Sequence, residues 1–453
     1  MHTLCVDFGT SSIRTALRKD GSALSLALPI APGSDIDNAS IPSAIYIPSG
    51  GGEVLFGMKA SVGGRSSRRK ALLLELSPKS WLGPESVAKI DHLAAEGVPF
   101  TRRQLIAGLL AFAFNASRRA AKPLVGGKGG FSFRISHPIW QEHDRVKLAE
   151  VYEGLRMGAR DEDAPNMKDT MSFSEFESWC AVVSIADKKP SSDVDVKEPV
   201  AAMLELFPDV EVNSRTAAFV IDVGSRTAAL VIDVGAGTID LGLFSSIIPN
   251  KGARVKSKLI PMTPPRSLFG AGDVIDQELL TMVSEKLDEK HANQLDAFSR
   301  NIRFQKETLF NTGRLVFRNV DISAEELMRR PRMRTMALNL GNAVTEMLDA
   351  AASKFEVQLN AVSHRLERLD VIFAGGGANL EFLKACIQQG VSIGEATLAV
   401  SRRTAKTPKN FPVEASRARM AVALGGTADE SVWPETEMKP AFRRALSLPI
   451  SGV

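Results

Sequence analysis

The chain of 453 residues is longer than one ordinary hydrophobic core supports, so two or three domains are expected. Hydrophobic residues make up 44% of the sequence and charged residues 24%, a composition typical of globular proteins and not of disordered chains. The formal net charge of +4 is too small to indicate a nucleic-acid partner, which requires a concentrated basic patch.

The first half of the chain begins with a predicted β-hairpin. Residues 3–8 are expected to form a buried strand that ends at Gly9, and residues 15–17 form the apolar centre of the returning strand. Apolar residues at helical spacing predict a helix over 101–121. The alternating residues 131–136 predict a further strand, so this half combines helices and strands.

The second half repeats this plan. Residues 228–234 predict a buried strand, a glycine-rich bend follows, and residues 239–244 predict the returning strand. A helix is expected from about Asp273. Residues 369–374 predict a buried strand that runs into three glycines, after which Asn379 is expected to cap a helix.

Two segments interrupt the plan. Residues 158–197 are charged and rich in Ser and Asp, which is typical of an insertion or a long surface loop. Residues 214–224 and 225–235 form a tandem repeat of 11 residues. We expect one copy to be extruded as a loop or an added edge strand. The chemistry is assigned to the second copy, because only this copy continues into the sequence Ala-Gly-Thr-Ile-Asp.

Cysteine usage and hydropathy predict a cytoplasmic protein. Cys5, Cys180 and Cys386 are odd in number and far apart, so a disulfide framework is not expected. Asp7 interrupts the first apolar run, and no signal-peptide pattern follows. No segment reaches the roughly 18 apolar residues that cross a bilayer, so no membrane partner is expected.

Three segments combine a buried strand with small residues in the bend that follows it. They are residues 7–12 (DFGTSS), 233–240 (DVGAGTID) and 374–379 (AGGGAN). Each alone is more often an ordinary turn. Their joint occurrence, at the start of each half and near the end of the second, is much more specific and favours a phosphate-binding function.

The residue types in the first two bends suit a polyphosphate. A bend without bulky side chains lets backbone N–H groups approach phosphate oxygens, and the hydroxyls of Thr10, Ser11 and Thr238 add donors. Asp7 and Asp233 at the strand ends can hold Mg²⁺ through water, because Mg²⁺ prefers oxygen ligands and keeps much of its hydration. The third bend, between a strand and a helix, can lie flat against a nucleoside.

In this order the three segments resemble the two phosphate loops and the adenosine motif of the actin/Hsp70/sugar-kinase superfamily. The similarity is greatest to Hsp70, and in particular to stand-alone bacterial Hsp70-like proteins that end after the nucleotide-binding domain. Four further segments carry this resemblance, which covers about residues 1–430. They are 77–83 (SPKSWLG), 135–138 (ISHP), 198–204 (EPVAAML) and 268–273 (LFGAGD).

The resemblance implies an α/β, actin-like (ribonuclease H-like) fold with two lobes around a central nucleotide cleft. The implied divisions are residues 1–212 as lobe I with the insertion 158–197, 213–404 as lobe II, 405–430 as a helix returning to lobe I, and 431–453 as a tail.

The resemblance also implies an ATPase that binds ATP, ADP and Mg²⁺. Lys79 would neutralise developing charge, Glu198 would orient the attacking water, Thr238 would contact the γ-phosphate, and Asp7 and Asp233 would organise Mg²⁺. The residues implied to contact the nucleotide are Asp7, Gly9, Thr10, Ser11, Gly235, Ala236, Gly237, Asp240, Gly270, Lys306, Gly375, Gly376 and Gly377.

This sequence departs from the Hsp70 pattern around adenine. Lys306 stands at the family's lysine, but Arg303 replaces a glutamate, Phe310 replaces a serine, and Asn379 replaces the arginine that stacks on adenine. Ala236 replaces a glycine of the second loop, and its side chain is small enough to be tolerated. These changes affect the base contacts more than the phosphate contacts.

Closure of the cleft around ATP implies a chaperone-like switch with a client or co-chaperone protein as partner. Three other interpretations remain open. They are a nucleotide-binding scaffold without turnover, an actin-like filament-forming ATPase, and a small-molecule kinase of the same superfamily. The altered adenine residues favour the scaffold, whereas segments 77–83 and 198–204 favour an Hsp70-like ATPase over a filament.

Overall fold

The protein is a mixed α/β structure, as the sequence predicts. The computed structural model describes residues 1–22, 25–31, 38–66, 71–83, 86–126, 130–137, 151–156, 166–182, 196–214, 226–247, 258–359, 368–387, 390–393, 396–404 and 417–428. Among them, no helix is both long enough and apolar enough to cross a membrane. Pro138, residues 215–225 of the tandem repeat and the tail 431–453 lie outside the described residues.

The first large sheet has the strand order β10-β8-β1-β2-β3, with β4 also paired to β2. Its first two strands form the predicted antiparallel hairpin, and β8 and β10 continue the sheet in parallel with β1. The strands are β1 (His2–Phe8), β2 (Ser12–Arg18), β3 (Ser25–Ala27), β4 (Ser40–Pro42), β8 (Phe131–His137) and β10 (Val196–Lys197).

The second large sheet has the order β13-β12-β11-β17-β19-β18, with β14 also paired to β12. It too begins with an antiparallel hairpin, β11 and β12, and continues with β17 and β19 parallel to β11. The strands are β11 (Arg226–Val234), β12 (Thr238–Ile247), β13 (Lys258–Pro261), β14 (Arg266–Phe269), β17 (Arg368–Ala374), β18 (Gly390–Ile393) and β19 (Ala396–Thr404).

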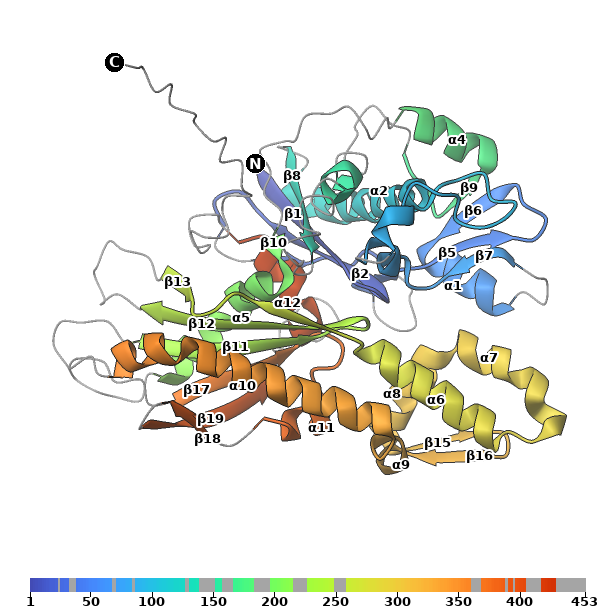
Figure 1. The fold of residues 1–453 in the computed structure, drawn as a ribbon. Helices are drawn as coiled ribbons and strands as arrows, with labels where there is room; N and C mark the ends of the chain where they lie inside the picture. Colours follow the sequence, from blue (N-terminus) through green and yellow to red (C-terminus); the bar gives the residue numbers. More distant parts are fainter. Residues whose placement is uncertain are drawn as a thin grey trace, which may run out of the picture.

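Each large sheet has its own hydrophobic core. One core draws its buried residues from Leu4 to Trp179, and the other from Val200 to Val422. Figure 1 shows the two sheets one above the other, with the blue and cyan elements of the first half over the green to red elements of the second. The exact division of the chain at residue 212 stays a prediction.

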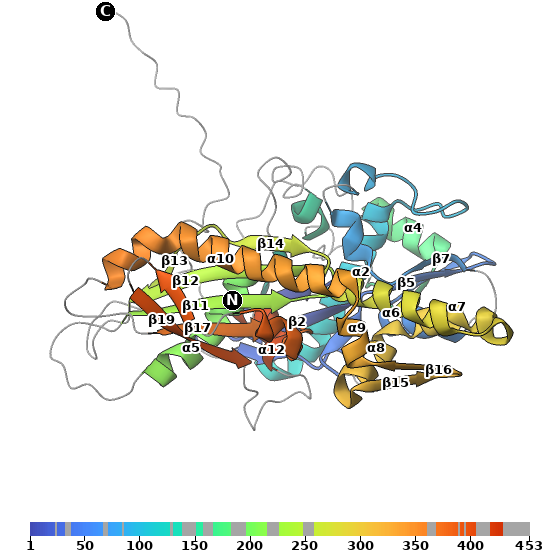
Figure 2. The ribbon, with the colours of Figure 1, turned by 60° about the horizontal axis from the view of Figure 1, so that its bottom comes forward.

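Two helices fill the space between the sheets. Helix α5 (Glu198–Ser214) packs on β11 and β12, and α12 (Arg417–Gly426) packs on α5 and on strands β1, β2 and β3. The helix backbones are so close that a β-carbon added at Gly425 would lie 1.7 Å from the carbonyl oxygen of Ala201. In both Figure 1 and Figure 2 the red α12 lies near the blue β2.

The remaining elements of the first half surround a smaller sheet of order β7-β5-β6-β9. Helix α2 begins as the sequence predicts, because Thr101 and Gln104 form a reciprocal capping box at its N-terminus. Within the predicted insertion 158–197, the described residues form β9, α4 and, at its end, β10. The elements are α1 (Gly57–Ser66), α2 (Arg102–Ala121), α4 (Phe173–Val182), β5 (Ile45–Pro48), β6 (Glu53–Phe56), β7 (Ala71–Glu75) and β9 (Thr170–Ser172), with short 3-10 helices at Pro78–Leu82, Val87–Lys89 and Lys122–Val125.

Helices α6 to α11 and a small hairpin, β15 and β16, complete the second half. Helix α10 crosses the second large sheet in Figure 2, and its apolar face belongs to that core. The elements are α6 (Gly272–Lys286), a 3-10 helix (Glu289–Gln294), α7 (Leu295–Arg300), α8 (Ile302–Thr312), β15 (Arg314–Phe317), β16 (Val320–Ser323), α9 (Ala324–Met328), α10 (Pro331–Leu359) and α11 (Glu381–Ala385).

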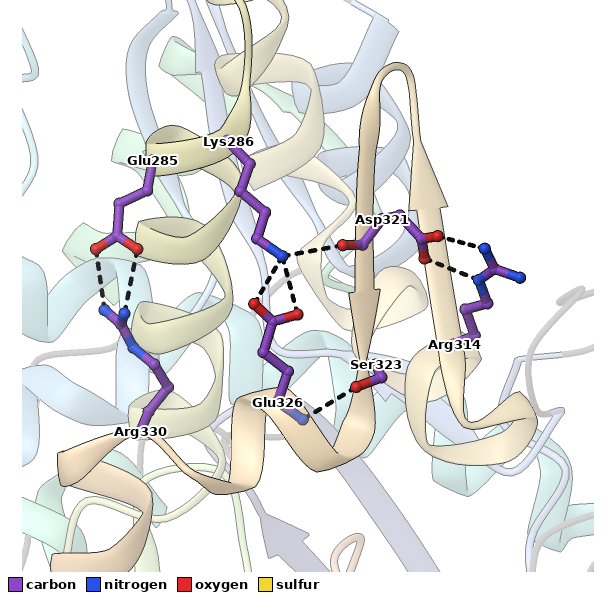
Figure 3. Close-up of polar contacts among 7 residues, drawn as sticks. All are labelled: Glu285, Lys286, Arg314, Asp321, Ser323, Glu326 and Arg330. Atoms are coloured by element: carbon purple, nitrogen blue, oxygen red, sulfur yellow. Dashed lines mark hydrogen bonds and ion pairs between the residues drawn. The ribbon is translucent and has the colours of Figure 1, made fainter.

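Charged side chains fasten the small hairpin to its neighbours (Figure 3). They join α6 to α9 and to the turn before α10, and they join β15 to β16 within the hairpin. Each exposed pair of this kind contributes little, about 0–1 kcal/mol. The pairs are Arg330–Glu285, Lys286–Glu326 and Arg314–Asp321.

The predicted cap at Asn379 is wrong, because α11 starts later, with Leu380 as the N-cap residue and no side-chain cap.

Candidate functional site

The turns of the two large hairpins have the same geometry. The amide of Gly9 donates to the carbonyl of Ser12 at 3.1 Å, and the amide of Gly235 donates to the carbonyl of Thr238 at 2.9 Å. Each hydrogen bond encloses two loop residues, so the first turn (Gly9–Ser12) and the second turn (Gly235–Thr238) are equivalent. The strands beside the turns are buried, whereas the residues enclosed by these two amide-to-carbonyl hydrogen bonds are half-buried.

The two turns meet. A β-carbon added at Gly237 would lie 3.1 Å from Thr10 Oγ1 and 3.5 Å from Asp273 Oδ2. The two turns, whose first glycines are 226 residues apart in sequence, therefore lie in one place. The third loop residue predicted to bind nucleotide, Ser11, belongs to the same turn as Thr10, and its carbonyl accepts from the amide of Ser43 at 3.1 Å.

The start of α6 holds the second turn in position. The amides of Gly272 and Asp273 donate to the carbonyls of Gly235 and Ala236 at 3.3 and 2.7 Å. The amide of Gly270 donates to the carbonyl of Gly237 at 2.9 Å, and the φ of Gly270 is +80°, which favours glycine. Gly270 therefore stabilises the second turn through this hydrogen bond.

The glycine turn after β17 lies against the other side of the second hairpin. The amide of Gly377 donates to the carbonyl of Val234 at 3.0 Å. Gly375 has a φ of +80°, and a β-carbon there would lie 2.2 Å from Asp233 Oδ1. Only glycine fits at this position, while Gly376 is exposed and has no neighbour within 4 Å of an added β-carbon.

Lys79 and Glu198 form a buried ion pair beside the turns. Lys79 Nζ donates to Glu198 Oε1 at 2.5 Å, and the two side chains are only 10% and 7% exposed. The short helix after Ser77 positions the lysine, and the first turn of α5 positions the glutamate, where the helix dipole favours a negative charge. The structure thus brings together two residues predicted to be catalytic.

The predicted aspartates lie on the strands next to the turns. Asp7 accepts from the hydroxyl of Ser136 at 3.2 Å, and Asp240 accepts from the hydroxyl of Thr238 at 2.8 Å. Asp233 lies opposite Asp240 in the strand register. Within the described part of the chain, the carboxylate of Asp233 receives no hydrogen bond and forms no ion pair, although it is 93% buried.

Burial and mutual repulsion dominate the electrostatics of this group. Burial raises the pKa of Asp233 well above 3.8, and the neighbouring Glu198 and Asp240 raise it further. Burial likewise raises the pKa of Glu198 to about 7, although Lys79 opposes the rise. Burial alone would lower the pKa of Lys79, but Glu198 and other nearby groups outweigh it, so its pKa is raised and it stays positively charged.

Lys306 extends the site along α8. Its Nζ lies 2.7 Å from Asp276 Oδ1 and donates to the carbonyl of Gly272 at 3.2 Å. One turn further along α8, the ring of Phe310 stacks on Phe382 of α11, with centroids 6.5 Å apart and planes 19° from parallel.

Arg303 and Asn379, the other two residues that stand in place of expected adenine contacts, do not share a common environment. Arg303 pairs within its own helix with Glu307 at 3.3 Å, and Asn379 is exposed.

The donor set suits a hydrated divalent cation better than a directly ligated one. Among the residues that the structure describes, no three His, Cys, Asp or Glu side chains are placed to hold a metal ion together. Mg²⁺ commonly uses one or two carboxylates, several waters and phosphate oxygens. The carboxylate of Asp233, which has no cation of its own in the described structure, fits that requirement.

Some residues of the site were missed by sequence reasoning. Arg14 lies 3.9 Å from Asp7, Ser43 donates to a carbonyl of the first turn at 2.7 Å, and Ser267 donates to Asp240. Burial raises the pKa of Asp273 to about 6, and repulsion from Asp276 adds to this. Only Arg14 has a sequence signal, because aligning the two hairpins places it at the position that corresponds to Asp240.

Chemically, the site combines amides in two tight turns, hydroxyls at their ends, one buried lysine and an excess of carboxylates. The amides and the lysine can bind an anion, and the carboxylates can balance a cation. No family model matches the chain, and no curated protein is significantly similar to it.

Proposed function

We propose that this protein binds ATP and ADP with Mg²⁺ and hydrolyses ATP in an actin-like, two-lobed fold of the Hsp70 type. The observation that carries the proposal is the contact between Thr10 and Gly237. Two equivalent turns that meet can surround one polyphosphate with backbone donors from both sides. A single turn of this kind would be unremarkable.

The repeated sheet plan supports the two-lobed fold. Each large sheet begins with a hairpin and continues with parallel strands on the same side of it. The separate cores support two lobes, and helices α5 and α12 would lie at their junction. In this arrangement the two turns would form the floor of a cleft between the lobes.

In the proposed mechanism, the side chains position the phosphates and stabilise charge. Lys79 would neutralise the negative charge that develops on the phosphoryl group, and Glu198 would hold the attacking water. Thr238 would contact the γ-phosphate, while the amides of the two turns orient the β- and γ-phosphates. Bound Mg²⁺ would supply positive charge to the phosphate oxygens, with Asp233 holding its waters.

The adenine base of the bound nucleotide would extend from the turns along α8. Lys306 lies beside the second turn, and Phe310 follows one helical turn later on the same face. Aromatic rings stack on nucleobases without strong preference for one base. Phe310 and Phe382 would therefore replace the polar and cationic contacts of Hsp70, and Gly375 to Gly377 would lie near the nucleoside.

The output would be a conformational change and not a metabolic product. Helices α5 and α12 connect the two sheets, so a movement of one sheet relative to the other is transmitted through them. A cytoplasmic chaperone-like switch that acts on a client or co-chaperone protein follows from this proposal.

One observation favours a second function, a nucleotide-binding scaffold without turnover. Lys79 and Glu198 are bound to each other, so each has to leave its partner before it acts on phosphate or water. Calorimetric titration with ATP and ADP, followed by a phosphate-release assay, separates the two functions. Binding with phosphate release supports the ATPase, binding alone supports the scaffold, and no binding rejects both.

A further inference from the structure

The two hairpins are equivalent in backbone but opposite in charge. In the first, Asp7 faces Arg14 across the strand pair, and in the second, Asp233 faces Asp240 at the corresponding positions. Directly opposite residues of antiparallel strands have β-carbons about 4.5–5.5 Å apart, so each pair interacts. One hairpin therefore pairs an acid with a base, and the other places two acids side by side.

The two pairs also differ in the groups that surround and neutralise them. Arg14 is 8% exposed, and its Nη1 lies 3.9 Å from Asp7 Oδ2. In the other pair, hydroxyl groups bind both oxygens of Asp240. The buried carboxylate of Asp233 receives no hydrogen bond and forms no ion pair among the described residues, and the cation that acts on it, Lys79, is already paired with Glu198. The first hairpin thus carries its own cation, and the second lacks one.

The charges of the facing residues on the two hairpins and of the adjoining Lys79–Glu198 pair show what is missing. When all are ionised, Arg14 balances Asp7, and Lys79 balances Glu198. Two negative charges remain, and both lie on the second hairpin, at Asp233 and Asp240. One divalent cation would neutralise this excess, whereas buried charges without a partner are strongly disfavoured.

We propose that Arg14 is a positioning residue that serves as a built-in cation for the first turn and thereby restricts the divalent cation to Asp233 and Asp240. Asp7 is then held by Arg14 and does not share the metal. The guanidinium adds positive charge beside the first turn, where it attracts phosphate. The assignment of the metal to Asp233 and Asp240 does not depend on the proposed function. The role of Arg14 toward phosphate rests on the proposed nucleotide binding.

The test uses Arg14→Met, which removes the charge and retains an unbranched apolar chain, in the full-length protein. Binding of Mn²⁺ to the free protein is followed by electron paramagnetic resonance, and binding of ADP without metal by calorimetry. We expect Mn²⁺ to bind about tenfold more tightly and ADP about tenfold more weakly, because one nearby positive charge has been removed. Arg14→Lys should behave like the parent.

Two further variants complete the design. Asp233→Asn should abolish Mn²⁺ binding, whereas Asp7→Asn should leave it within about threefold, as expected for a residue outside the metal's surroundings. Arg18→Met, on the same strand, should change neither measurement, because Arg18 instead donates to the carbonyl of Ser22.

Opposite shifts cannot arise from loss of folding, which would weaken both ligands together. The inference is overturned when Arg14→Met weakens or leaves unchanged the binding of Mn²⁺, or when Asp7→Asn abolishes it. If the parent protein binds Mn²⁺ as expected but binds no ADP, the nucleotide proposal fails while the assignment of the metal to the second hairpin stands.

Discussion

Thr10 and Gly237 lie against each other, so that a β-carbon on the glycine would come within 3.1 Å of the threonine hydroxyl oxygen. The two residues belong to separate hairpins of separate sheets. Their contact places the first and second turns in one site, together with the Lys79–Glu198 ion pair and the surrounding carboxylates. The proposed chemistry depends on this arrangement.

Replacing Lys79 with Met should slow phosphate release from ATP about 30- to 1000-fold, equivalent to about 2–4 kcal/mol for one preorganised charge. The single variant leaves Glu198 buried without its cation, which destabilises the fold. The double variant Lys79→Met/Glu198→Gln removes both charges, so it separates the loss of catalysis from a loss of folding. The exposed Lys89 provides the control Lys89→Met, which should retain the parental rate. Turnover at the parental rate in Lys79→Met would remove Lys79 from the mechanism.

Gly425→Ala should destabilise the protein by about 3 kcal/mol or more, because the added β-carbon would press on the carbonyl oxygen of Ala201 and separate α12 from α5. Urea unfolding measures the effect. Gly341→Ala in α10 is the matched control, since its β-carbon would approach no atom closer than 3.6 Å. That control should gain about 0.5–1 kcal/mol from helix propensity. Equal stability of the two variants would contradict the close packing of α5 and α12.

The stability of the protein without ligands should depend on the ionisation of Asp273. Its pKa in the folded state is about 6, raised from 3.8 by burial, so the folded state binds the proton more tightly than the unfolded chain. The contribution of Asp273 to the free energy of unfolding should therefore fall as pH rises from about 4 to about 6 and level off above this range.

Asp273→Asn removes this dependence while keeping the amide that supports the second turn. The variant should match the parent near the low end of the range and become more stable than the parent as pH rises. Urea unfolding at several pH values, with Asp349→Asn of the exposed face of α10 as control, tests this. A constant difference between variant and parent at all pH values would show that Asp273 does not titrate in this range.

Local pattern was sufficient to predict much of the fold. Apolar runs and small-residue bends placed both large hairpins, and apolar residues at helical spacing placed α2. Asn379 failed as a cap because the glycine turn continues past it and hydrogen bonds from Leu380 onward start the helix. Helix caps depend on backbone direction, which residue type alone does not define.

The site was only partly predictable for a different reason. The turns were visible because glycines and aspartates cluster in sequence, but Ser43 and Ser267 reach the site from neighbouring strands or loops. Hydroxyl groups of this kind carry no local pattern. The pairing of Lys79 with Glu198 joins residues 119 positions apart, so it depends on the packing of α5 and not on either segment.

The most direct measurement is a calorimetric titration of the full chain with ADP and Mg²⁺, carried out beside the folded variant Gly237→Val. A valine there would push its β-carbon and methyl groups against Thr10 and separate the two turns. The account predicts saturable one-to-one binding by the parent and at least a hundredfold loss of affinity, about 2.7 kcal/mol, in the variant. Equal affinity in both proteins, or no binding by the parent, would contradict a nucleotide site between the two turns.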